Sequence, residues 1–158
     1  MAAQAGVATS VTTDRGCYLV GQTVQLNGSG FEPFRTYVVS IDGVYLGART
    51  TDSDGNLSVP LHPGGLPAGA AQHLDNLQVT DGTMSAQTSF MLTRSAGALI
   101  TNTAGSTRSL TGRFLVWGFS RGGTARPVYV HYVSPSGKVR KTVTLGNTAG
   151  QCGYLRTG

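Results

Sequence analysis

Short runs in which apolar and polar residues alternate recur along the first part of the chain, and they constrain its fold more than any other feature. Val24 and Leu26 alternate with polar neighbours, and the same spacing returns at 37–41, 57–61 and 77–79. A period of two is typical of strands that bury one face. Only 12% of the residues are charged, which disfavours surface helices. We therefore predict an all-β chain of short strands.

Asp-Gly pairs separate several of these runs. They stand at 42–43, 54–55 and 81–82. Asp-Gly supplies the positive φ angles that two-residue hairpin loops need, so each pair predicts a hairpin. A stretch rich in Pro and Gly at 60–69 predicts an irregular crossing between strands. The pattern favours an immunoglobulin-like (Ig-like) β-sandwich over residues 7–94, with about seven strands.

The acidic residues of the chain are confined to its first 94 positions. All seven Asp and Glu lie there beside four Arg, whereas residues 95–158 carry the other eight Lys and Arg. The formal charges are −3 and +8, which add up to the +5 of the whole chain. We therefore expect a second, small and basic β module over 98–158. It has no carboxylate side chain that could serve as an acid, a base or a metal ligand.

The second module looks shorter than the first. Strands are predicted at 113–119, 128–133 and 139–145, with a turn at 135–137. A weak internal repeat aligns this region with the first module up to residue 61, and the first module then continues to residue 94. Three interpretations stay open. The sequence is cut inside a second sandwich, the second module is a small unit that leans on the first, or another segment supplies the missing strands.

The chain carries signs of an extracellular location. No run approaches the ~18 apolar residues of a membrane span. Residues 2–6 resemble the small-residue end of a cleaved signal peptide, although an ordinary disordered terminus would look the same. Cys17 and Cys152 either form a disulfide, which requires an oxidising compartment, or are two free buried thiols. We expect a secreted protein.

Three stretches of the first module together resemble bacterial secreted and cell-surface Ig-like modules. They are Gly-Ser-Gly-Phe-x-Pro at 28–33, Asp-Gly-Val-Tyr-Leu-Gly at 42–47 and Thr-Asp-x-Asp-Gly at 51–55. Residues 114–155 resemble a companion module of similar proteins. Such modules serve as spacers, adhesive units or filament subunits and usually have no catalytic site. The resemblance therefore transfers no catalytic residue and no cofactor.

Motifs of enzymes and metal sites are present only in part. The Gly-x-Ser-x-Gly pattern at 118–122 matches a hydrolase nucleophile elbow, but no helix is predicted after it and no acidic residue follows. Asp52, Asp54 and Asn56 have the spacing of a calcium loop without its bidentate Glu, so we interpret them as a turn. The histidines are scattered: His62, His73 and His131. We predict no catalytic residue, no metal site and no cofactor.

The basic residues of the second module are the strongest candidates for a binding site. The set is Arg121, Arg126, Lys138, Arg140 and Lys141. Exposed clusters of this kind attract polyanions. The alternatives are a solubilising face or a face that docks on the acidic first module. No RNA-recognition or OB signature is visible, which argues against nucleic acid.

These observations predict a non-enzymatic, extracellular structural or adhesive Ig-like module. Two alternatives stay open. One is a self-assembling subunit of a filament or virion surface, completed by strand exchange. The other is a carbohydrate- or polyanion-binding module that uses the basic hairpin. The expected partners are a cell-surface polymer or protein, or copies of the chain itself.

Overall fold

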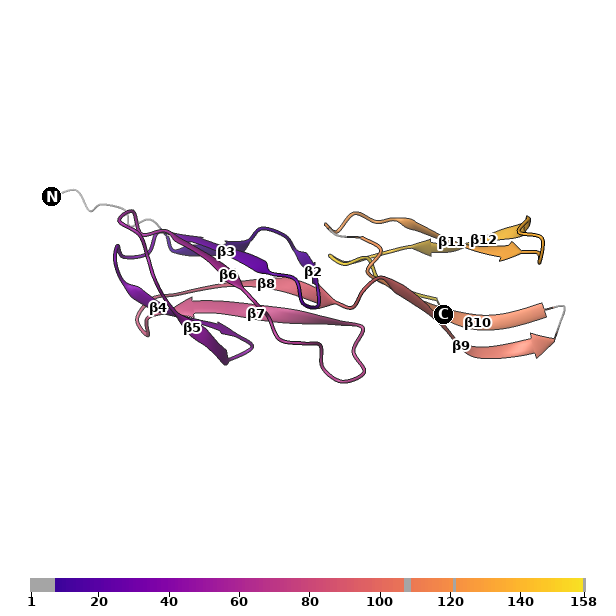
Figure 1. The fold of residues 1–158 in the computed structure, drawn as a ribbon, viewed down its shortest axis with the longest axis horizontal. Helices are drawn as coiled ribbons and strands as arrows, with labels where there is room; N and C mark the ends of the chain where they lie inside the picture. Colours follow the sequence, from indigo (N-terminus) through magenta and orange to yellow (C-terminus); the bar gives the residue numbers. More distant parts are fainter. Residues whose placement is uncertain (1–7, 107–108, 121, 158) are drawn as a thin grey trace.

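The computed structural model describes residues 8–106, 109–120 and 122–157. Within these ranges the chain forms thirteen strands and no helix (Figure 1), which confirms the predicted all-β, sandwich-type fold. The described ranges accordingly include no helix that is long and apolar enough to cross a membrane.

Two sheets form a sandwich in the first half of the chain, residues 8–94. One sheet is antiparallel and has the order β1 (Ser10–Thr13), β3 (Val24–Ser29), β6 (Leu57–Leu61). The other has the order β2 (Cys17–Leu19), β8 (Ser85–Thr93), β7 (Gln72–Thr80), β4 (Thr36–Ile41), β5 (Val44–Thr50). Only β2 and β8 of this second sheet run parallel. The order β8, β7, β4, β5 corresponds to strands G, F, C and C′ of variable-type immunoglobulin domains.

The alternating residues form the core between these sheets. On β4 the buried positions are Tyr37, Val39 and Ile41, and β6 buries its first, third and fifth residues in the same way. Aromatic rings meet edge to face, with 5.3 Å between the ring centroids of Tyr18 and Phe90. Each large side chain buried in this way contributes about 1.5–3 kcal/mol to stability.

The Asp-Gly pairs at 42–43 and 81–82 both lie in hairpins, but with different loops. Asp42 and Gly43 form the two-residue loop that was predicted between β4 and β5, with φ angles of 48° and 78°. The loop between β7 and β8 has four residues, because Thr80 pairs with Ser85. There the Asp81 carboxylate accepts backbone N–H groups of the loop, which stabilises a longer turn.

The hairpin predicted at 54–55 is wrong. The turn connects β5 of one sheet to β6 of the other, so the flanking strands do not pair. Asp52 explains the change of direction, since its Oδ1 accepts the backbone N–H groups of Asp54 at 2.9 Å and Asn56 at 2.7 Å. This carboxylate therefore stabilises the turn itself, as expected for the turn interpretation of these residues.

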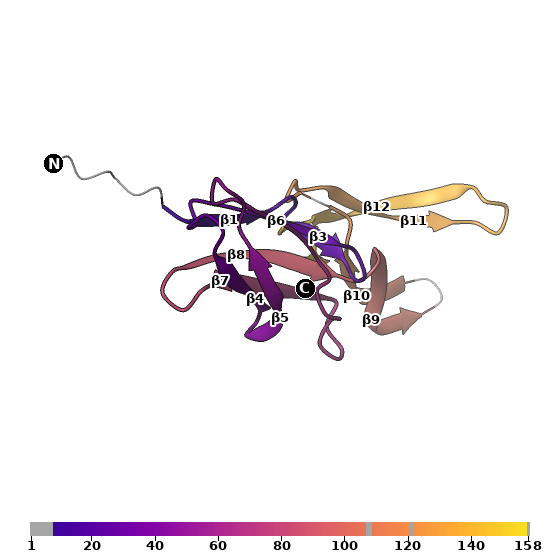
Figure 2. The same cartoon turned by 60° about the vertical axis from the view of Figure 1, so that its left-hand side comes forward.

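The second half, residues 95–157, forms two further small sheets. One contains β9 (Gly97–Ser106), β10 (Ser109–Trp117) and the two-residue β13 (Leu155–Arg156). The other is the hairpin of β11 (Pro127–Val133) and β12 (Val139–Asn147). Both views show these sheets as two layers beyond one end of the sandwich (Figures 1 and 2). The three predicted strands are present, whereas β9 and β13 were not predicted.

The second half has a small core, and it lies near the first half. Its described buried residues are Val116, Ser120, Thr148, Cys152 and Gly153. Inward residues farther along the β11–β12 hairpin are only half-buried: Val128, Val130, Val143 and Leu145. Complete sandwiches bury such positions between two sheets. These two layers therefore cover each other only in part.

A disulfide joins the two halves, and a hydrogen bond holds the start of the second half in place. The Cys17–Cys152 disulfide, one of the two alternatives left open by the sequence, is present, with a sequence separation of 135 and 5.3 Å between the two Cα atoms. At the connection between the halves, Trp117 donates its indole N–H to the carbonyl of Ser95 at 2.9 Å. A Cβ on Gly97 would lie 2.6 Å from the Trp117 ring, so the ring packs directly on this backbone.

Candidate functional site

The predicted basic residues do not form one patch. Lys138, Arg140 and Lys141 lie at the tip of the β11–β12 hairpin, beside the turn. Arg126 lies at the opposite end, where its backbone N–H donates to the Thr148 hydroxyl. The length of β11 separates the two places by about 20 Å, at ~3.3 Å per strand residue. Arg121 lies outside the described residues.

The three basic residues at the hairpin tip are exposed and point to both faces of the hairpin. Lys141 pairs with Tyr132 and Val143 with Val130, so Lys141 lies on the partly covered inner face. Arg140 is its neighbour along β12 and therefore lies on the outer face. All ion pairs among the described residues belong to the first half. The hairpin tip therefore presents positive charge to solvent on two sides.

The Gly-x-Ser-x-Gly motif lies at a buried bend. Ser120 is 7% exposed, and its hydroxyl donates to the carbonyl of Thr124 at 2.8 Å. A Cβ on Gly153 would lie 2.4 Å from the Ser120 backbone nitrogen, so two chain segments meet here. The Ser120 hydroxyl is thus hydrogen-bonded within the bend that contains it, which supports a structural role for the motif.

A cluster that sequence reasoning did not predict lies at one end of β7. Asp42, from the β4–β5 loop, and His73 and Asp75, from β7, bring their side chains together. Nε2 of His73 lies 3.0 Å from Oδ2 of Asp42 and 3.6 Å from Oδ1 of Asp75. The pairing of Ile41 with Leu77 places the loop beside β7. The one signal in the sequence is the His-x-Asp spacing, which puts both β7 side chains on the same face.

The two carboxylates of this cluster have different surroundings. Hydrogen bonds from the Asn76 side chain and backbone hold the pKa of Asp42 below its ordinary value, with His73 adding to the effect. Asp75 is 5% exposed and follows the same inward face as Leu77 and Val79. Burial raises the pKa of its carboxyl group, although the nearby His73 partly offsets this. Asp75 thus occupies a position where the rest of β7 carries core residues.

No protein-family model matches this chain, and no curated protein is significantly similar to it in sequence. Function is therefore inferred from the geometry of the chain itself.

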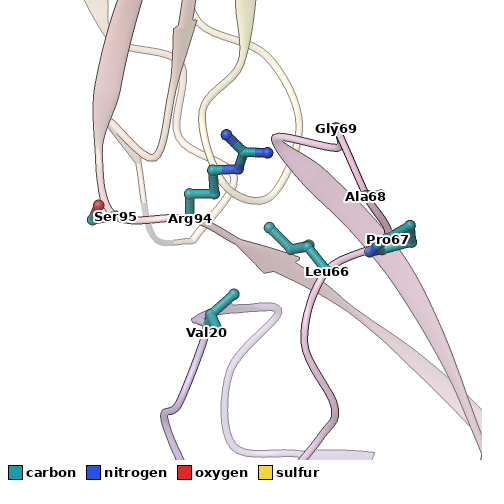
Figure 3. Close-up of a pocket in the computed structure, with 7 residues that line it drawn as sticks. All are labelled: Val20, Leu66, Pro67, Ala68, Gly69, Arg94 and Ser95. Atoms are coloured by element: carbon teal, nitrogen blue, oxygen red, sulfur yellow. The ribbon is translucent and has the colours of Figure 1, made fainter.

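A cavity lies at the end of the first half, beside the connection to the second half (Figure 3). It has a volume of about 560 Å³, and its lining is mostly apolar or backbone: Val20, Leu66, Pro67, Ala68, Gly69, Arg94 and Ser95. The Arg94 side chain rises beside the loop and is the one charged group of this lining. One cation beside an apolar surface is suited to weak binding of another molecule. The lining offers no pair of groups for acid–base chemistry.

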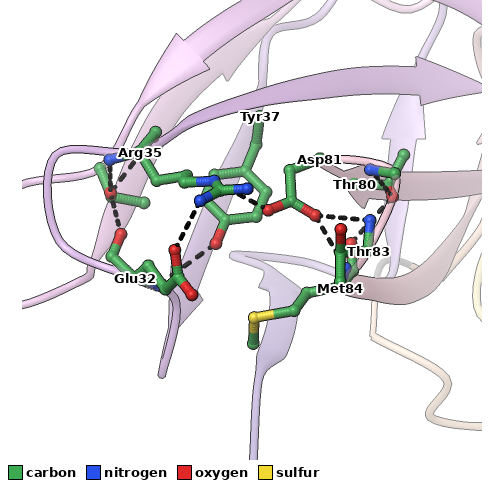
Figure 4. Close-up of polar contacts among 9 residues, drawn as sticks. Glu32, Arg35, Tyr37, Thr80, Asp81, Thr83 and Met84 are labelled. Carbon is green, nitrogen blue, oxygen red and sulfur yellow. Dashed lines mark hydrogen bonds and ion pairs between the residues drawn. The ribbon is translucent and has the colours of Figure 1, made fainter.

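A polar network braces the far end of the sandwich (Figure 4). Arg35 pairs with Glu32 at 2.9 Å and with Asp81 at 3.0 Å, which connects the loop after β3 to the β7–β8 loop. Backbone N–H groups of Met84 and Thr83 hold the pKa of Asp81 below its ordinary value. The contacts of this network hold the two loops together, and we therefore assign the network a structural role.

Proposed function

We propose that this chain is an extracellular, non-enzymatic structural module whose two halves act as one mechanical unit. The observation that carries the proposal is the Cys17–Cys152 disulfide, which has a sequence separation of 135. Structural disulfides persist in oxidising compartments, which supports an extracellular location. The hydrogen-bonded hydroxyl of Ser120 also supports a role without catalysis.

The position of the bridge protects the fold against pulling. Force that enters the backbone before β1 and leaves after β13 passes through the S–S bond, so only these two strands, which lie outside the bridge, carry it directly. The hydrogen bonds among the other strands then bear little of the load. This property suits a spacer or adhesive unit that is anchored at one end and bound at the other.

Single-molecule stretching tests the proposal. Oxidised protein pulled from its two termini should extend only through the residues outside the bridge. Reductant should add a further step of about 450 Å, since the cysteines are 135 positions apart in the sequence and each position contributes ~3.3–3.6 Å when extended. Extension of the whole chain without reductant would contradict the mechanical role.

A second candidate function is self-assembly through the second half. Large apolar side chains are exposed on the β11–β12 hairpin: Tyr129 (50%), Tyr132 (45%), Val133 (56%) and Val139 (51%). Both outer edges of this two-stranded hairpin are free of further strands among the described residues. Open edges favour strand addition. The charges of +8 and −3 on the two parts of the chain also make the second half of one copy complementary to the first half of another.

Sedimentation over a range of protein concentrations tests self-assembly. The average mass should rise above the 16.4 kDa of one chain as concentration increases. A Val133→Lys, Val139→Lys variant should shift this rise to higher concentrations. The matched control is Val44→Lys, Tyr45→Lys, which changes residues of similar exposure on the β4–β5 hairpin of the first half. A monomer at every concentration, or equal effects of both variants, would exclude assembly through the second half.

A further inference from the structure

We propose that Asp42, His73 and Asp75 form a binding site for a divalent transition metal ion of the zinc type. One nitrogen and two carboxylate oxygens, one from each residue, lie within 4.8 Å of one another. Imidazole and carboxylate are ordinary zinc ligands. The site lies in the first half and is independent of the mechanical role proposed above.

Two of the three distances between the ligand atoms are close to those of tetrahedral coordination. Metal–ligand bonds of about 2.1 Å place neighbouring tetrahedral ligands about 3.4 Å apart. The Nε2 atom of His73 lies 3.0 Å from the Asp42 oxygen and 3.6 Å from the Asp75 oxygen, on either side of this value. The two carboxylate oxygens lie within 4.8 Å of each other, so side-chain rotation is needed to bring all three atoms onto one ion.

Hydrogen bonds from Asn76 orient the Asp42 carboxylate and leave one of its oxygens available to a metal ion. Its Oδ1 accepts the backbone N–H of Asn76 at 3.1 Å and the Asn76 side-chain amide at 3.0 Å. The other oxygen, Oδ2, faces His73. Hydrogen bonds of this kind to the second oxygen orient carboxylate ligands in metal sites.

Asp75 provides an independent indication of a ligand. It is 5% exposed, and a buried carboxylate is costly unless it is paired, hydrogen-bonded or bound to a metal. The Nε2 atom of His73 lies 3.6 Å from its Oδ1, which is beyond hydrogen-bonding distance. A metal ion between the three residues would pair with this carboxylate.

There is room for an ion and for a further ligand. A cavity of about 320 Å³ adjoins the cluster, and His62, Gly64 and Gly65 contribute to its lining. With three protein ligands, a fourth position remains for water or for a donor from a bound molecule. Ca²⁺ prefers about 6–8 oxygen ligands, so this donor set does not suit it.

Isothermal titration with zinc chloride tests the site. Wild-type protein should bind one Zn²⁺ per chain and give no comparable signal with Ca²⁺ or Mg²⁺. Asp75→Asn and His73→Ala should each weaken binding at least tenfold. The control is His131→Ala, which removes an exposed histidine whose ring contacts Thr142 on the second-half hairpin. His62→Ala shows whether that side chain completes the coordination.

Nuclear magnetic resonance of the histidine rings provides a second measurement that does not depend on a variant's folding. Zinc should shift the Nε2 signal of His73 in the wild-type protein and leave the His131 ring unchanged. Absence of zinc binding by the wild type would overturn the proposal. So would Zn²⁺ binding that Asp75→Asn and His73→Ala leave intact, or an unshifted His73 ring, since the three residues would then form an ion pair only.

Discussion

The carbonyl oxygen of Phe31 lies where a side chain on Gly55 would begin. A Cβ built on Gly55 would be 2.0 Å from that oxygen, and the Phe31 N–H donates to the Gly55 carbonyl at 3.1 Å. The Gly-Ser-Gly-Phe and Asp-x-Asp-Gly segments, which are distant in sequence, therefore meet backbone to backbone. This contact gives a physical reason for the two segments to occur together in one chain.

We expect Gly55→Ala to destabilise the first half severely. The φ angle of Gly55 is +73°, and the added methyl group would overlap the Phe31 carbonyl. Gly43→Ala is the matched control, because Gly43 has φ +78° with nothing within 4 Å of the added Cβ. The control should lose about 1–2 kcal/mol through backbone strain alone. Urea unfolding should show a clearly larger loss for Gly55→Ala, and equal losses would show that the close contact does not matter.

Removal of the disulfide should cost more than the loss of any surface contact. Closing a loop this long stabilises a protein by about 4–5 kcal/mol in the chain-entropy model. The loss of unfolding free energy should be similar for the double variant Cys17→Ala, Cys152→Ala and for the reduced wild type. Two reactive thiols in unfolded, unreduced protein would contradict the bridge.

The second half has a small core, so its amide hydrogens should exchange faster than those of the first half.

The fold was predictable where local chemistry decides it. Asp42 and Gly43 adopt the predicted loop because both have positive φ, as a two-residue hairpin loop requires. At 54–55 and 81–82 the same dipeptide gives other turns, because Asp52 and Asp81 bind backbone N–H groups of their own loops. Dipeptide identity alone does not contain this information.

Other features depend on pairing between distant segments. Strand β9 was missed because Thr-Asn-Thr-Ala-Gly at 101–105 shows no alternation, and its pairing with β10 supplies the strand. The cluster of Asp42, His73 and Asp75 was missed because it arises from the register of β4 against β7. The basic residues were found from composition, yet Arg126 lies apart from Lys138, Arg140 and Lys141 because β11 separates them.

Stability should fall in acid below about pH 4. Tyr18, Asn56 and Met84 are the main hydrogen-bond donors that lower the pKa values of Asp14, Asp52 and Asp81, respectively, from an ordinary 3.8. A lowered pKa means that stabilisation is complete above the unfolded value and is lost as pH falls through the folded value.

Calorimetry between pH 6 and pH 2 checks this expectation. Asp14→Asn should show a shallower decline of melting temperature than the wild type, because it removes the carboxylate to which the Tyr18 hydroxyl donates. The buried Asp75 acts in the opposite direction, since burial raises its pKa. A melting temperature that stays constant down to pH 2 would show that these hydrogen bonds contribute no net stability.

Variants at the tip of the basic hairpin distinguish two roles for its charges: polyanion binding, and docking between the halves. If it binds polyanions, heparin affinity should fall steeply with salt, because each neutralised site releases counterions. Lys138→Ser, Arg140→Ser, Lys141→Ser should abolish most of this binding and preserve the fold, since all three side chains are exposed. Arg126→Ser is the control at the far end of the hairpin and should have a smaller effect.

If the tip instead docks on acidic surface of the first half, the same triple variant should lower the melting temperature without affecting polymer binding. The decrease should be a few degrees at most, because exposed ion pairs each contribute about 0–1 kcal/mol. Heparin chromatography and thermal unfolding of the same two variants separate these outcomes. Unchanged melting with no heparin binding would exclude both and leave the positive charge with a solubilising role.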